Sequence, residues 1–234
     1  MVIDRFALVL ALCLVFSACS RPSFNKGVDA FNAKDYAAAL AQWKPLADSG
    51  DAQAQADVGT IYMQGLGVAQ DAAQAAHWYT LAAAQGHPDA EANLGVLYMN
   101  GQGVPRDPAL AHSWFAKAAA QDQHVAAFNL GVLYDNGQGG PVDKAKSVQY
   151  YTQAANLGDA EAQENLGVDY ATGDGVAADK VQAYRWLSLG SRGEADPQQK
   201  TQVDANLARL KSGMTPAQIA QGDAAIAAFK PKPH

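Results

Sequence analysis

The sequence predicts an all-α fold, an α/α superhelical solenoid of helical-hairpin repeats that ends in a C-terminal helical cap. The first observation is composition: 49% of the residues are hydrophobic and 17% are charged, with abundant alanine, which favours an ordered helical protein. The second is a 36-residue spacing that links Gly59 to Gly167, Tyr62 to Tyr170 and Trp78 to Trp186 through intermediate copies. The third is a helix stop and a helix start inside every unit. Such a period is typical of stacked repeats that contact only their neighbours.

The first helix of each unit is expected to end at a pair of glycines. Gly95 and Tyr98 fall on one helical face, which we expect to be buried. Gly101 and Gly103 follow, and glycine readily adopts the left-handed dihedrals that commonly end a helix. The ring that recurs at this position, as in Tyr134, is therefore expected to lie in the core.

A second helix follows each glycine pair. Asp107 can cap its exposed N–H groups, and Pro108 suits its first turn, where no N–H donor is needed. Ala118 and Ala119 provide small side chains where helices approach closely, and Trp114 is expected to fill the space beside them. Each unit therefore predicts a helical hairpin. The same capping aspartate recurs at Asp71, Asp143 and Asp179.

Residues 1–18 are predicted to be a signal peptide that is removed on export. Arg5 precedes an apolar run of eleven residues, 6–16, which is too short to span a bilayer that needs about twenty. The letters Ser-Ala-Cys that end at Cys19 resemble a bacterial lipobox, so we expect Cys19 to be lipidated and residues 19–26 to form a tether. If that motif is not a lipobox, the protein is a soluble secreted effector.

These features predict a place in the bacterial cell envelope, with the outer membrane favoured and the protein facing the periplasm. A lipid anchor at Cys19 would attach the chain to the membrane, and Ser20 stands where an aspartate commonly marks inner-membrane retention in enteric bacteria. The formal net charge of −6 and the pI near 5.2 argue against nucleic acid as a partner, because phosphate contacts need clustered Lys and Arg. Cys13 would be removed with the signal peptide, so the mature chain would keep only Cys19 and could not form a disulfide within one copy.

One unit reads LGVLYMNGQGVPRDPALAHSWFAKAAAQD, and its glycines, aromatic residues, aspartate and paired alanines follow a known repeat pattern. This pattern resembles the Sel1-like repeat, a relative of the tetratricopeptide repeat, over roughly residues 50–190. We expect four Sel1-like repeats over residues 51–192, a tetratricopeptide-like first unit at 27–50, and capping helices with a frayed tail over 193–234. The resemblance implies a right-handed α-solenoid that binds other proteins, and it implies no chemistry.

No catalytic, cofactor-binding or metal-binding residues are predicted. The best single match runs from Ser23 to Lys26 and fits the S-x-x-K pattern of penicillin-recognising enzymes, but it lies in the predicted tether and its companion motifs are absent. A cysteine-rich branch of the Sel1-like family, with members described as β-lactamases, staples each repeat with a disulfide that this chain lacks. A hydrolase of cell-wall or β-lactam substrates is therefore the alternative to a protein-binding scaffold.

A ladder of amides is the candidate partner-binding feature. Asn93, Asn129 and Asn165 precede the Leu-Gly pair in three successive units and lie about 140° from the buried face on a helical wheel, which points them towards the concave surface. Amides both donate and accept hydrogen bonds, so the ladder can bind the backbone of an extended segment from an unidentified envelope protein or peptide. The alternative is that each Asn ties one repeat to the loop of the next. The flanking residues that vary between units are Met63, Met99, Asn100, Asp135 and Asn136.

Overall fold

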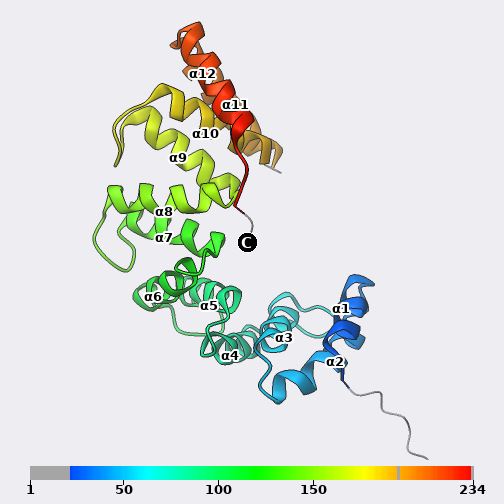
Figure 1. The fold of residues 1–234 in the computed structure, drawn as a ribbon. Helices are drawn as coiled ribbons and strands as arrows, with labels where there is room; N and C mark the ends of the chain where they lie inside the picture. Colours follow the sequence, from blue (N-terminus) through cyan, green and yellow to red (C-terminus); the bar gives the residue numbers. More distant parts are fainter. Residues whose placement is uncertain (1–21, 194–195, 233–234) are drawn as a thin grey trace, which may run out of the picture.

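The computed structural model describes residues 22–193 and 196–232, which form twelve helices and no strand. Successive helix pairs stack into a curved, open arc, which confirms the predicted all-α solenoid (Figure 1). Within the described ranges no helix combines the length and the apolar character needed to cross a membrane. The helices are α1 (Phe24–Asn32), α2 (Tyr36–Asp48), α3 (Ala52–Gln64), α4 (Ala72–Ala83), α5 (Pro88–Asn100), α6 (Pro108–Ala119), α7 (His124–Asn136), α8 (Lys144–Asn156), α9 (Ala160–Thr172), α10 (Lys180–Gly193), α11 (Pro197–Ser212) and α12 (Pro216–Ala228).

Local signals in the sequence set the helix ends. Gly101 closes α5 in the left-handed conformation with φ of 69°. A side chain at Gly103 would collide with the backbone of Ala72 in the preceding repeat, so this glycine also lets consecutive repeats approach closely. The carboxylate of Asp107 accepts the Leu110 N–H at 2.9 Å, which confirms its predicted role as the cap of α6.

The centre of each repeat is a contact between a glycine on the first helix and a ring or leucine on the second. A Cβ atom built on Gly95 would lie 2.6 Å from the Phe115 ring, and one on Gly131 would lie 2.5 Å from the ring of Tyr151. Phe115 is fully buried and Tyr151 is 3% exposed. Glycine at this position therefore makes room for a large buried side chain from the second helix of its own repeat.

The expected burial of the recurring aromatic residues is confirmed for Trp78 and Trp186, which are 5% and 3% exposed, but it is wrong for three others. Tyr98, Tyr134 and Trp114 are only half-buried. Tyr134 instead stacks on Tyr150 with 5.7 Å between ring centroids. The residue after the tryptophan position, such as Phe115, is turned by about 100° around the second helix, and this rotation points it at the first helix of its own repeat.

The N-terminal unit begins earlier than expected. Helix α1 starts at Phe24, so the predicted tether over residues 19–26 is wrong from this residue on. The Phe24 carbonyl accepts the Trp43 indole N–H at 3.1 Å, and this contact fixes α1 against α2. The predicted signal peptide and the lipidation site Cys19 lie outside the described residues.

Helices α11 and α12 pack on α10 and cover the last repeat. The tail beyond α12 returns towards α8 and is not frayed through Lys232, contrary to expectation (Figure 1). Phe229 meets Trp186 edge to face at 5.7 Å, and the Lys232 N–H donates to the Asn156 carbonyl at 2.9 Å. These contacts hold a short extended segment against the solenoid.

Candidate binding groove

The first helices of the repeats line the inner side of the arc. Figure 1 shows α3 and α5 on this side and α4 and α6 on the outer side. Three hollows follow one another along these helices. The first, about 360 Å³, lies between α1, α2 and α3; the second, about 270 Å³, spans α3, α5 and α7; the third, about 390 Å³, lies chiefly between α7 and α9.

The three hollows are continuous because neighbouring hollows share lining residues. Gln53, Asp57 and Thr60 line both the first and the second, and Val125 lines both the second and the third. We call this depression the inner groove. Its lining residues come from the N-terminal unit, through α1 and α2, and from all four repeats, through α3, α5, α7, α9 and the end of α10.

The residues that cap α5 and α7 connect each of these helices to the first helix of the preceding repeat. His87 caps α5 and its Nε2 lies 2.9 Å from Gln53 Oε1 on α3. Gln123 caps α7 and donates to Asp89 Oδ1 on α5 at 3.3 Å. Because the caps stand 36 residues apart in the chain, these contacts repeat along the wall of the inner groove.

The three members of the predicted Asn ladder lie in different hollows. Asn93 lines the second hollow and Asn129 lines the third. Asn165 lies in a separate hollow of about 230 Å³ beside Asp135 and Asp169. Asn129 donates to the carbonyl of Val125 in its own helix at 2.7 Å.

The bonds that tie neighbouring helix pairs together come from another repeated position. Gln55 donates to the Ala47 carbonyl at 3.0 Å, and Gln163 donates to the Ala155 carbonyl at 3.0 Å. Both glutamines are 4% exposed. Each glutamine therefore joins the start of one first helix to the end of the preceding second helix. In the sequence, each stands two residues before the ladder position of its own helix.

The flanking residues proposed from the sequence divide into two groups. Met63 and Met99 are half-buried and pack partly against the hydrophobic core. Asn100 and Asn136 are exposed at the ends of α5 and α7. Asp135 is already paired, since its carboxylate lies 2.6 Å from Lys144 Nζ.

Asp57 is the groove residue that the sequence analysis missed. It stands 36 residues before Asn93 and so occupies the ladder position of the first repeat. Counting 36 residues back from Asn93 in the sequence would have identified it. Burial is the main cause that raises the pKa of Asp57 to about 6; a hydrogen bond from Gln53 opposes this rise, and the nearby charges of Asp51 and Asp89 contribute to it.

A second group of carboxylates surrounds Lys144 at the loop end of α7 and α9. Lys144 Nζ lies 2.6 Å from Asp135 and 3.1 Å from Asp174, and these hydrogen bonds raise the pKa of the lysine. Burial, together with the charges of Asp135 and Asp174, raises the pKa of Asp169 to about 7. The hollow beside Asn165 is therefore lined by three carboxyl groups, those of Asp135, Asp169 and Asp174, and by one lysine, Lys144.

The groups with catalytic potential in the inner groove are engaged elsewhere. The Thr60 hydroxyl lies 3.1 Å from the Ala56 carbonyl and 3.1 Å from the Tyr79 hydroxyl. His87 contacts Gln53 through Nε2 and accepts the Ala90 N–H through Nδ1. Thr60 and His87 are thus not joined as nucleophile and base. Across the described ranges, no cluster of His, Cys, Asp and Glu could hold a metal ion.

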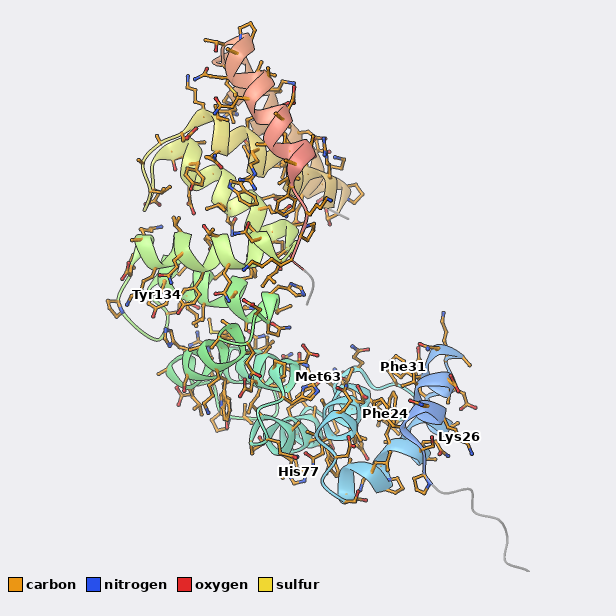
Figure 2. The ribbon with its side chains drawn as sticks, in the orientation of Figure 1. Phe24, Lys26, Phe31, Met63, His77 and Tyr134 are labelled. Carbon is orange, nitrogen blue, oxygen red and sulfur yellow. The ribbon has the colours of Figure 1, made fainter. Side chains whose placement is uncertain are left out.

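The S-x-x-K match is also separated by the structure. Figure 2 shows Phe24 and Phe31 on the side of α1 that faces α3, with Lys26 on the opposite side. Ser23 precedes the helix, and its backbone N–H donates to Gln42. Lys26 is exposed, so the match is part of a helix start and not of a pocket.

Comparisons with known proteins agree with this architecture. The Sel1 repeat family matches residues 52–87, 88–123, 124–159 and 160–193. A solved Sel1 repeat protein from Oxalobacter formigenes is 28% identical with a TM-score of 0.72, over 89% of this chain and 86% of that one. The antigen c5321 of uropathogenic Escherichia coli, which has an SLR fold, is 29% identical with a TM-score of 0.74, over 87% of this chain but only 44% of its own.

A Sel1 repeat protein from Klebsiella pneumoniae shares the fold with a TM-score of 0.52 at 22% identity, over 80% of this chain and 91% of that one. No curated protein matches the chain. The four matched segments cover more than half of the sequence, in agreement with the resemblance read from the repeated residues. The chain belongs to the Sel1 repeat family.

Proposed function

We propose that this protein is a protein-protein interaction scaffold whose inner groove binds an extended segment of a partner. The observation that carries the proposal is the continuity of the groove, because hollows that share Asp57 and Val125 form one path that runs from the N-terminal unit along the first helices of all four repeats. An extended chain fits a long, shallow path of this kind better than a small molecule, whose sites are usually enclosed. The Sel1 repeat fold is consistent with such a scaffold.

The repeated amides supply the recognition chemistry. Asn93 and Asn129 belong to consecutive repeats and line consecutive hollows. Each amide can donate to a carbonyl and accept from an N–H of an extended backbone, whatever the side chains of the partner. Between them, Ala92 and Phe128 line the floor of the groove and offer apolar contact.

The location of the protein is part of the proposal. The lipobox-like residues that end at Cys19 support a lipid anchor in the bacterial envelope, with the outer membrane favoured and the solenoid in the periplasm. A partner would then be an envelope protein. A cell-wall or β-lactam hydrolase is less favoured, because Thr60 and His87 make separate hydrogen bonds instead of a nucleophile-base pair.

A photo-crosslinking residue placed at Asn93 tests the groove in intact cells. We expect crosslinks to a defined partner from Asn93 and none from the same residue placed at Gln149, which is exposed on the second helix α8. Equal crosslinking from both positions would contradict a groove-specific scaffold. Turnover of a cell-wall or β-lactam substrate by the pure protein would overturn the assignment altogether.

The triple variant Asn93→Ala, Asn129→Ala, Asn165→Ala separates recognition from folding. If the ladder binds the partner, capture should fall while the melting temperature stays within a few degrees of the wild type. If the amides are structural ties, the variant should lose about 0.5–1.5 kcal/mol of stability per lost bond, and capture should fall only as folding does. Measuring both quantities on one preparation distinguishes these outcomes.

A further inference from the structure

The charged residues of the inner groove all have the same sign. Asp57 and Asp89 line the second hollow, and Asp159 and Glu161 line the third. His87 is the other titratable residue there, and of the described residues that line the groove none is a lysine or an arginine. The chain has 17 lysines and arginines in all, so this segregation gives the groove a negative field.

The two carboxylates at the centre of the groove have neutral partners. Gln53 donates to Asp57 and Gln123 donates to Asp89, each at 3.3 Å. Throughout the described segments, no lysine or arginine forms an ion pair with either carboxylate. Both carboxylates face an open hollow, where a cation from outside the chain can reach them.

A separate hollow, at the loop end of α7 and α9, does hold a lysine that the chain supplies. Lys144 projects between Asp135 and Asp174 and contacts both carboxylates within 3.1 Å. This arrangement is the local precedent for an ammonium group seated among carboxylates of the first helices and their loops. The second hollow has the carboxylates of such a site without the lysine.

The C-terminal tail is a lysine-containing segment that packs against this solenoid in an extended conformation. Phe229 is extended, with φ of −69° and ψ of 129°, and its ring packs on Trp186. Pro231 then lies against Gly158, the residue before the groove carboxylate Asp159. The Lys232 backbone bonds to the end of α8, which leaves its side chain exposed. A lysine- and proline-containing segment therefore ends beside the third hollow.

We propose that the inner groove binds an extended, lysine- and proline-containing segment of a partner protein, with its ammonium groups beside Asp57 and Asp89. The inference rests on the proposed scaffold function and specifies the chemistry of its partner. Proline keeps such a segment extended and lowers the entropy lost on binding, while lysine supplies the charge that the groove lacks. The tail of this chain has the same composition.

Ionisation of Asp57 gives the interaction a dependence on pH. The titratable groups around this carboxyl are Asp51 at the start of its own helix, Tyr79 on α4, and His87 and Asp89 at the start of α5. A bound ammonium favours the ionised carboxylate, whose pKa lies near 6 in the free protein. Binding should therefore release protons near pH 6 and weaken as the pH falls from 7 to 5.

The test uses the full chain and fluorescein-labelled octapeptides in a fluorescence anisotropy titration. One peptide alternates lysine with proline, and the matched control alternates glutamate with proline. We expect the lysine peptide to bind at least about tenfold more tightly, with affinity falling as salt is added. The double variant Asp57→Asn, Asp89→Asn should weaken binding by about fivefold, since an ion pair that solvent can reach contributes modestly.

A second double variant, Asp48→Asn, Asp223→Asn, removes the same charge from α2 and α12 and should change the affinity less than twofold. Circular dichroism on each variant checks that it is folded. Equal binding of the two peptides, or an equal loss in the two double variants, would overturn the proposed partner chemistry. If the Asn93 crosslinks persist in that case, the scaffold stands and only the cationic segment is wrong; if they too are absent, the groove itself is not the binding site.

Discussion

Replacing Asp169 with asparagine is expected to stabilise the protein above pH 7 and to leave its stability nearly unchanged near pH 4. Burial and the charges of Asp135 and Asp174 raise the pKa of Asp169 from 3.8 to about 7 in the folded protein. A raised carboxyl pKa means that the folded state holds its proton more tightly than the unfolded state. The wild type therefore loses stability as the pH rises from about 4 to about 7, and the neutral asparagine does not.

The size of the effect follows from the shift. A difference of about three units corresponds to roughly 4 kcal/mol at 1.36 kcal/mol per unit. Asp169 is only partly buried, so solvent screening reduces the expected gain to about 1–2 kcal/mol. Lys144 keeps both of its carboxylate partners, Asp135 and Asp174, in the variant. The substitution therefore removes repulsion without leaving a cation unpaired.

Urea denaturation at pH 4.5, 6, 7 and 8.5 measures the difference in unfolding free energy between the variant and the wild type. The urea midpoints can be compared if the dependence of the unfolding free energy on urea concentration has the same slope in both proteins. Asp48→Asn, on the exposed surface of α2, is the control for a change of net charge. A gain that is the same at every pH would refute the argument from the pKa. A variant that is less stable than the wild type at pH 8.5 would refute the claim that the ionised carboxylate is destabilising.

Two further predictions address the core and the anchor. Tyr151→Ala should cost about 3–5 kcal/mol because the ring is 3% exposed and fills the space over Gly131, whereas Tyr134→Ala should cost about 1 kcal/mol for a half-buried stacked ring. Chemical denaturation compares the two, and equal costs would contradict the observed packing. Cys19→Ser should abolish incorporation of labelled palmitate and release the protein from membranes. A wild-type protein that takes up no label would contradict the lipid anchor.

The sequence predicted repeated amides on the candidate binding surface, but it did not predict the acidic residues that surround them. The ladder of Asn93, Asn129 and Asn165 was visible from the period, but only Asn93 and Asn129 line the inner groove, whereas Asn165 lies in a separate hollow. The acidic character of the groove was not visible, because Asp57 and Asp89 occupy different repeat positions on different helices. They line one hollow only after α3 and α5 have stacked.

The sequence by itself determined the solenoid, since its signals are local and repeated: Asp107 caps a helix, Gly101 ends one, and a 36-residue period stacks the pairs. Only the tertiary structure decided which of two adjacent aromatic residues is buried, because Trp114 and Phe115 have similar hydrophobicity and differ only in the direction of their side chains. That direction depends on where Gly95 of the partner helix leaves room. The course of the tail was decided in the same way, since the contacts of Phe229 and Lys232 with Trp186 and Asn156 join residues far apart in the chain.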